Sequence, residues 1–131
     1  MNNELIKERL INFWKNTETK KLASIFEQYM NNMGVRKLNR RRKNNKNTYL
    51  IDGKSTGWNR VSCYYYKNSE KYSEEELSMT LRKKSGNYFI VEKHGIRCFE
   101  IDYSGIRHYD ENLLNEVIEE NKDLFKIMGI I

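Results

Sequence analysis

The sequence predicts an α+β fold: an N-terminal helical pair, an antiparallel β-sheet with a C-terminal meander (about 88–109), and a C-terminal helix that covers the sheet. Apolar residues recur every three or four positions in 3–33 and in 110–128, the period of helices that bury one side. Between these two stretches, β-prone residues are divided by glycines. A length of 131 residues predicts a single domain over 1–131.

The helical segments carry recognisable ends. We expect a first helix over about 3–15 and a second over 18–33, which Thr17 can cap and Gly34 can end. Asp110 is a good N-cap for the last helix, whose apolar stripe runs to Met128. The outer side of this helix is acidic: Glu111, Glu116, Glu119, Glu120 and Asp123.

The first strand signals follow residue 47. Thr48–Ile51 is β-prone and leads into the turn pair Asp52-Gly53, with a loop that extends to Gly57. The next strand, over 58–67, alternates between two faces. One face carries Val61, Cys63 and Tyr65, and the other carries Trp58, Arg60, Ser62, Tyr64 and Tyr66.

Residues 74–84 carry two conflicting signals. Glutamates at 74–76 and basic residues at 82–84 suit the two ends of a helix. Leu77, Met79 and Leu81 instead alternate with polar residues, which is the period of a strand. We favour a strand, because it would extend the sheet that follows.

Two similar hexapeptides predict the meander. Glu92–Arg97 and Asp102–Arg107 both read acid-x-x-Gly-Ile-Arg. With two-residue turns at His94-Gly95 and Ser104-Gly105, each acid would lie opposite its own arginine. This register would put one set of residues on the core face: Tyr88, Ile90, Phe99, Ile101, Tyr103 and Ile106.

Positive charge is concentrated in one short stretch. The chain has a formal net charge of +6, and seven basic residues stand among the eleven of Arg36–Lys46: Arg36, Lys37, Arg40, Arg41, Arg42, Lys43 and Lys46. The rest of the chain carries 17 basic and 18 acidic residues. We therefore expect an exposed basic segment at 35–47 that binds a polyanion, because cations that meet phosphates release condensed counterions.

Aromatic residues supply a second binding candidate. Trp58, Tyr64 and Tyr66, with Arg60 beside them, can stack unpaired bases on a sheet face. Together with the basic segment they predict a small, non-catalytic nucleic-acid-binding module, with RNA or a ribonucleoprotein favoured over DNA because no helix-turn-helix pattern is present. Abundant Asn, Lys, Ile and Tyr and the absence of Pro suggest a phage or mobile element of a low-GC bacterium.

Two other functions stay open. A phage-type host-defence inhibitor could bind a host nucleic-acid enzyme, such as a guide-RNA-loaded CRISPR nuclease (an anti-CRISPR role), with its acidic last helix imitating phosphates. A small metal-independent ribonuclease could use His108 or His94. A metal-dependent nuclease is disfavoured, because the register above separates Glu92 from Glu100 and Asp102.

The sequence contains no cofactor motif and no metal-ligand spacing. Cys63 and Cys98 are expected to be reduced, half-buried thiols. We expect His94 to be a solvated turn residue and His108 to be half-buried. No apolar run of about 18 residues is present, which argues against a membrane span. Glu4 and Glu8 are unlike a signal peptide, so we expect a cytoplasmic location in a bacterial host cell, without a membrane partner.

Overall fold

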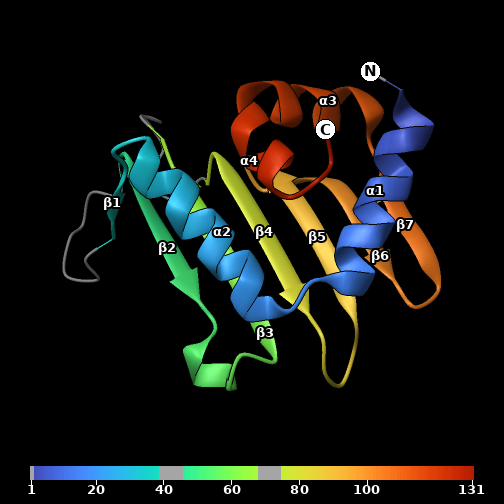
Figure 1. The fold of residues 1–131 in the computed structure, drawn as a ribbon, viewed down its shortest axis with the longest axis horizontal. Coiled ribbons are helices and arrows are strands. Elements are labelled where there is room, and N and C mark those ends of the chain that lie inside the picture. Colours follow the sequence, from blue (N-terminus) through green and yellow to red (C-terminus); the bar gives the residue numbers. More distant parts are fainter. Residues whose placement is uncertain (1, 39–45, 68–74) are drawn as a thin grey trace.

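The computed structural model describes residues 2–38, 46–67 and 75–131 and has the predicted α+β fold. One sheet forms one layer, and all the helices lie on the same side of it (Figure 1). The helices are α1 (Asn3–Asn16), α2 (Thr19–Asn32), α3 (Glu111–Glu120) and α4 (Lys122–Ile127), with the short 3₁₀ turn η1 (Lys54–Thr56). The strands are β1 (Arg36–Lys37), β2 (Thr48–Asp52), β3 (Arg60–Tyr66), β4 (Leu77–Arg82), β5 (Tyr88–Lys93), β6 (Ile96–Asp102) and β7 (Gly105–Tyr109).

The strands lie side by side in the order of the chain, from β1 to β7. Every neighbouring pair is antiparallel except β1 and β2, which run parallel with Arg36 beside Thr48. The sequence did not predict β1, because two charged residues carry no strand period of their own. Residues 77–82 form β4, as the alternation of Leu77, Met79 and Leu81 predicted, and these three side chains are fully buried.

The N-terminal helices form as predicted, with one difference at the start of α2. Glu18 occupies the N-cap position, so Thr17 does not cap this helix. The helix ends before Gly34, whose φ of 74° is the left-handed conformation that glycine adopts easily. Val35, just after it, is buried, so the exposed part of the basic segment begins at Arg36.

The predicted single C-terminal helix is divided in two at Asn121. Asp110 caps α3 as predicted, accepting a hydrogen bond from the Leu113 amide at 3.1 Å. Asn121 is buried, donates to the Val117 carbonyl at 2.9 Å and accepts from the Tyr29 hydroxyl at 3.2 Å. These two bonds satisfy the amide where the helix breaks, and α4 then packs against α2.

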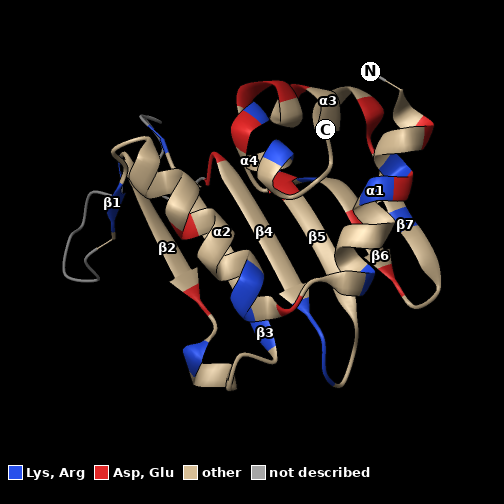
Figure 2. Ribbon diagram, viewed as in Figure 1, with Lys and Arg blue, Asp and Glu red and all other residues tan. Residues whose placement is uncertain are grey.

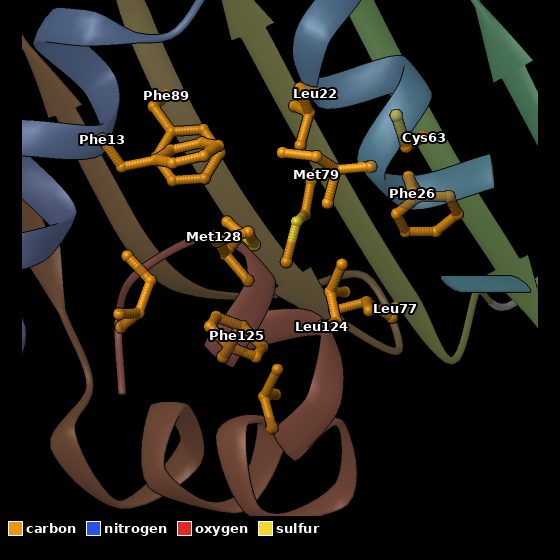
Figure 3. Packing of buried hydrophobic residues seen from close by; sticks show 14 of the residues in the cluster. Phe13, Leu22, Phe26, Cys63, Leu77, Met79, Phe89, Leu124, Phe125 and Met128 are labelled. Carbon is orange, nitrogen blue, oxygen red and sulfur yellow. The ribbon is translucent and has the colours of Figure 1, made fainter. Parts of the chain in front are cut away.

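The core lies between the sheet and the helices (Figure 3). Phe13 of α1 packs on Phe89 of β5, with ring centroids 5.3 Å apart, and Phe125 of α4 is fully buried. Cys63 and Cys98 are free thiols but are fully buried, not half-buried as expected. Burial raises the pKa of both thiols, that of Cys98 to about 12.

For the first hairpin of the meander, between β5 and β6, the predicted turn is confirmed, but the predicted assignment of β5 side chains to the two sheet faces is wrong. His94-Gly95 forms the turn, and Glu92 lies opposite Arg97. A β-bulge then leaves Cys98 without a residue opposite, so Val91 pairs with Phe99. This shift of one residue turns Phe89 and Val91 to the core, while Tyr88 and Ile90 lie on the other face.

The second half of the meander also differs from the prediction. Tyr103-Ser104 forms the turn, so Asp102 pairs with Gly105 and not with Arg107. Arg107 Nε still lies 3.8 Å from the Asp102 carboxylate. Tyr103, predicted in the core, is 84% exposed at the tip of the turn. Across the described ranges, no helix is long and apolar enough to cross a lipid bilayer.

Candidate nucleic-acid interface

The face of the sheet that points away from the helices, here called the open face, carries part of the predicted site. Side chains alternate along β3, so Val61, Cys63 and Tyr65 enter the core. Arg60, Ser62, Tyr64 and Tyr66 lie on the open face, as their spacing predicted. Figure 1 shows the helices on the other side of this sheet only.

Tyr64 and Tyr66 form an aromatic pair on the open face. Their ring centroids are 6.4 Å apart and their planes differ by 27°, which is a stacked arrangement. Leu50 and Ser78 lie beside Tyr64 on the neighbouring strands. Burial, the Glu75 carboxylate and Tyr64 raise the pKa of Tyr66 to about 12, so its phenol is neutral at physiological pH.

Positive charge lies on the same face. Arg60 of β3 stands directly opposite Arg82 of β4, and like charges in this position repel. Arg82 Nε donates to the Lys84 carbonyl at 3.0 Å, and in the described part of the chain no carboxylate pairs with either guanidinium. Arg36 lies at the edge of this face, beside Thr48. The β1–β4 half of the open face also carries the Asp52 carboxylate, opposite Ser62, and the Glu75 carboxylate lies near Tyr66. Arg36, Arg60 and Arg82 outnumber these two carboxylates, so positive charge predominates there.

The β5–β7 half of the open face neutralises its own charges. Arg97 lies 3.4 Å from the Glu92 carboxylate and 2.8 Å from that of Glu100, and Arg107 lies near Asp102. Glu92, Glu100 and Asp102 share this face, so the predicted separation of Glu92 from the other two is wrong. Even so, the described residues contain no group of three His, Cys, Asp or Glu that could hold a metal ion.

Of the two histidines, His108 differs from the sequence prediction. His108 is exposed on the open face opposite Glu100, because the bulge in β6–β7 turns it away from Ile101. His94 does lie in its predicted turn, but its Nε2 is 3.1 Å from the carboxylate of Glu76.

The predicted basic segment is only partly described. Arg36 and Lys37 are exposed in β1, and Lys46 is exposed just before β2. Lys37 lies on the helix side of the sheet, where its Nζ is 3.4 Å from the Glu27 carboxylate. Arg40, Arg41, Arg42 and Lys43 lie outside the described residues.

Trp58 does not join Tyr64 and Tyr66. Its backbone turns at a φ of 65°, and its side chain packs against the core on the helix side. There it lines a hollow of about 410 Å³ together with Lys20, Lys54 and Ile51.

A second group of basic residues gathers at one edge of the molecule. Figure 2 shows Lys and Arg where α2 begins, at η1, at the start of β3 and after β4. This basic edge consists of Lys20, Lys21, Lys54, Arg60, Arg82, Lys83 and Lys84. Acidic residues lie on α3 and α4, at the other end of the view. The sequence does not show that these residues lie together, because they come from four separate segments.

One buried cation is fully compensated. Lys93 of β5 is enclosed by three carboxylates: Glu116 at 3.0 Å, Glu76 at 3.9 Å and Glu120 in a short hydrogen bond. Burial lowers the pKa of Lys93, but the bonds to Glu120 and Glu116 outweigh it and leave the pKa raised. Lys93 is thus a charged structural residue between the sheet and α3.

No family model, no curated protein and no solved structure matches this chain, so its function has to be inferred from the open face and the basic edge.

Proposed function

We propose that this protein is a small, non-catalytic module that binds single-stranded nucleic acid, RNA in preference to DNA, on the open face. The observation that carries the proposal is the stacked pair Tyr64–Tyr66 on the same face as Arg60 and Arg82, two cations with no carboxylate partner among the described residues. Tyr64 and Tyr66 are half-buried, so part of each ring is open to solvent. Accessible aromatic rings on an antiparallel sheet accept unstacked bases, and neighbouring guanidiniums can hold the phosphates.

The geometry suits a nucleic-acid strand that runs along β3, from Arg60 towards Tyr64 and Tyr66. Arg60 and Tyr64 are four residues apart on β3, which at strand rise is about 13 Å, close to two nucleotides of an extended strand. Ser62 between them is small and buried, and Ser78 beside Tyr64 is buried as well. Neither would obstruct a base that approaches the tyrosines.

The basic segment extends this surface in the proposal. Arg36 and Thr48 are neighbours, and Thr48 in turn lies beside Tyr66. Both ends of the segment are therefore anchored at the edge of the open face. Arg40, Arg41, Arg42, Lys43 and Lys46 would supply further phosphate contacts from there.

Fluorescence anisotropy with a labelled single-stranded RNA and the DNA of the same sequence tests the proposal. Tyr64→Ala with Tyr66→Ala removes two stacking surfaces and should cost about 1–3 kcal/mol per base. Tyr103→Ala is the matched control, because Tyr103 is exposed at a distant turn. Equal affinity for the double variant and the wild type would refute the open face as the binding surface.

Salt dependence tests the cations separately. Arg60→Gln with Arg82→Gln should lower the slope of log affinity against log salt by about 1.4, since each single-strand phosphate contact contributes about 0.7. Changing Arg40, Arg41 and Arg42 to Ala should lower it by about 2. Lys126→Gln, an exposed lysine of α4, should leave the slope unchanged.

Two alternative functions each have one observation in their favour. The acidic surface of α3 and α4 suits an inhibitor that imitates phosphates toward a host nucleic-acid enzyme, such as a guide-RNA-loaded nuclease. Co-purification with such an enzyme, without affinity for free nucleic acid, would support that function. The exposed position of His108 opposite Glu100 suits a metal-independent ribonuclease, which RNA cleavage lost in His108→Ala would support. We place all three activities in the cytoplasm of a bacterial or phage-infected cell.

A further inference from the structure

A hollow of about 410 Å³ lies on the helix side of the sheet, between α2 and the corner formed by β2, η1 and β3. Its lining includes three lysines, one carboxylate and two apolar side chains: Lys20, Lys37, Lys54, Glu27, Ile51 and Trp58. This volume is within the range of small-molecule sites, and the mixture of apolar wall and a few charged groups is typical of them.

The charges of the hollow do not balance. Glu27 is its only carboxylate in the described part of the chain, and it already accepts from Lys37 Nζ at 3.4 Å and from the Tyr49 hydroxyl at 3.0 Å. Lys20 and Lys54 have no carboxylate partner among the described residues. Two lysines beside a concave wall thus remain available to an anion.

Trp58 is held in place by its own backbone. Its φ of 65° is uncommon for a bulky residue and costs free energy. The Trp58 amide donates to the Gly53 carbonyl at 2.9 Å, and the Trp58 carbonyl accepts from the Thr19 hydroxyl. Gly53 lies directly against the indole, because a Cβ there would come within 2.9 Å of the ring. The indole is therefore positioned before any ligand arrives.

Trp58 also lines a second, smaller hollow of about 280 Å³. Lys20 is shared between the two hollows, and Lys83 and Lys84 line the smaller one. Lys83 Nζ donates to the Trp14 carbonyl, which leaves Lys84 as the more available cation of that pair. Glu18 also lines the smaller hollow and its charge acts on Lys83, so a ligand that extends past Trp58 would meet Lys84 as the cation that Glu18 does not offset.

We propose that the larger hollow binds a nucleoside phosphate, with the base against Trp58 and the phosphate held by Lys20 and Lys54. An aromatic wall alone would accept any planar apolar ligand, and lysines alone would accept any anion. Their combination selects a molecule with a flat ring at one end and a phosphate at the other. This site is on the opposite side of the sheet from Tyr64 and Tyr66, so it does not depend on the open-face proposal.

Amide and indole NMR spectra of the ¹⁵N-labelled protein can test this site directly. The chain contains two tryptophans, so two indole signals are expected, and Trp58→Phe assigns them. The probes are a nucleoside 5′-diphosphate, the same nucleoside without phosphate, and inorganic phosphate. We expect the diphosphate to move the Trp58 indole signal in a saturable way, and the signal of Trp14, which is buried in α1, to stay unchanged.

Two sets of variants complete the experiment. Lys20→Gln with Lys54→Gln should weaken diphosphate binding about tenfold, given the free energy of two exposed charge pairs. Lys126→Gln, which makes the same change on α4, should leave binding unchanged. Because the substituted lysines are at the surface, an unchanged spectrum elsewhere will show that these variants fold.

Three results would overturn the proposal. One is that the diphosphate does not move the Trp58 signal, and another is that the lysine variants bind it as tightly as the wild type does. The third is that the nucleoside alone or phosphate alone binds as tightly as the diphosphate. None of these results bears on RNA binding by the open face, which the variants of Tyr64 and Tyr66 test independently.

Discussion

Replacing Lys93 by methionine removes a buried cation and keeps most of the length of the side chain. Lys93 is enclosed by Glu76, Glu116 and Glu120, so the substitution leaves three carboxylates near one another without their shared counter-charge. Removing one partner of a fully buried ion pair costs about 3–5 kcal/mol. Here the Glu76 side chain is 13% exposed, but those of Glu120 and Glu116 are 35% and 57% exposed.

Solvent screens the two more exposed carboxylates, which reduces the expected loss in the free energy of unfolding to about 2–3 kcal/mol near neutral pH. Lys122→Met is the matched control. Lys122 Nζ lies 2.8 Å from Glu119, but both side chains are more than half exposed. An exposed pair of this kind contributes at most about 1 kcal/mol.

The loss should depend on pH in a defined direction. Burial and the hydrogen bond with Glu120 raise the pKa of Glu76, while His94 and Lys93 oppose the rise. Without Lys93 the pKa of Glu76 should rise further. An acid whose pKa is raised by folding destabilises the fold above that pKa, and the penalty disappears as pH falls through it. The Lys93→Met variant should therefore lose more stability at about pH 8 than at about pH 5.

Glu120 also makes the stability loss of Lys93→Met larger at neutral pH than at acidic pH. Burial raises its pKa, but the hydrogen bonds from Lys93 and Glu76 outweigh burial and leave the pKa lowered. Its stabilising contribution is present above the unfolded pKa and is lost as pH falls through the folded one. Lys93→Met removes this contribution at neutral pH, where it is largest.

Urea unfolding followed by circular dichroism, at both pH values, measures these differences. The reasoning would be refuted if Lys93→Met and Lys122→Met lost equal stability, or if the loss caused by Lys93→Met were greater at the lower pH.

Three further predictions concern the core and the turns. Phe89→Ala should lower the free energy of unfolding by about 3–5 kcal/mol, because Phe89 is fully buried between two other phenylalanines; a loss below 1 kcal/mol would contradict this packing. Gly53→Ala should lower the free energy of unfolding by about 1–3 kcal/mol, because the new Cβ would lie 2.9 Å from the Arg60 carbonyl oxygen. Thermal denaturation measures this loss, and an unchanged melting temperature would contradict the close contact. Cys63 and Cys98 should react with a thiol reagent only after unfolding; rapid labelling of the native protein would show that they are accessible.

The spacing of apolar residues along the sequence correctly predicted most of the helices and strands. The helices followed from their apolar stripes, and the strand Leu77–Arg82 followed from its alternation despite a charge order that suited a helix. Likewise, the placement of Arg60, Tyr64 and Tyr66 on one face needed only the two-residue period of a strand.

The errors came from single residues that interrupt a regular pattern. The bulge at Cys98 and the turn at Tyr103-Ser104 each shift a register by one residue or more, and one residue is enough to exchange the faces of a strand. The buried amide of Asn121 divides a helix whose apolar stripe continues without a gap. Bulges and breaks of this kind depend on packing against distant segments, which the local sequence does not encode.

The candidate sites illustrate the same limit. Tyr64 and Tyr66 are close in sequence, so their pairing could be predicted. The lysines around Trp58 come from α2 and η1, and the carboxylates around Lys93 come from α3 and from Glu76, just before β4, so only the fold brings them together. A search for charge runs in the sequence finds Arg36–Lys46 and misses both of these clusters.

The two outer strands of the sheet bear on how the protein behaves at high concentration. An unpaired strand edge is a template on which another chain can add a strand, and this is a common route to aggregation. On one side the outer strand, β1, is only two residues long and both residues are charged. On the other side β7 is interrupted by a bulge and presents Arg107 and His108 to solvent. Short length, charge and a bulge all disfavour edge-to-edge pairing, so we expect the native protein to resist sheet-mediated self-association.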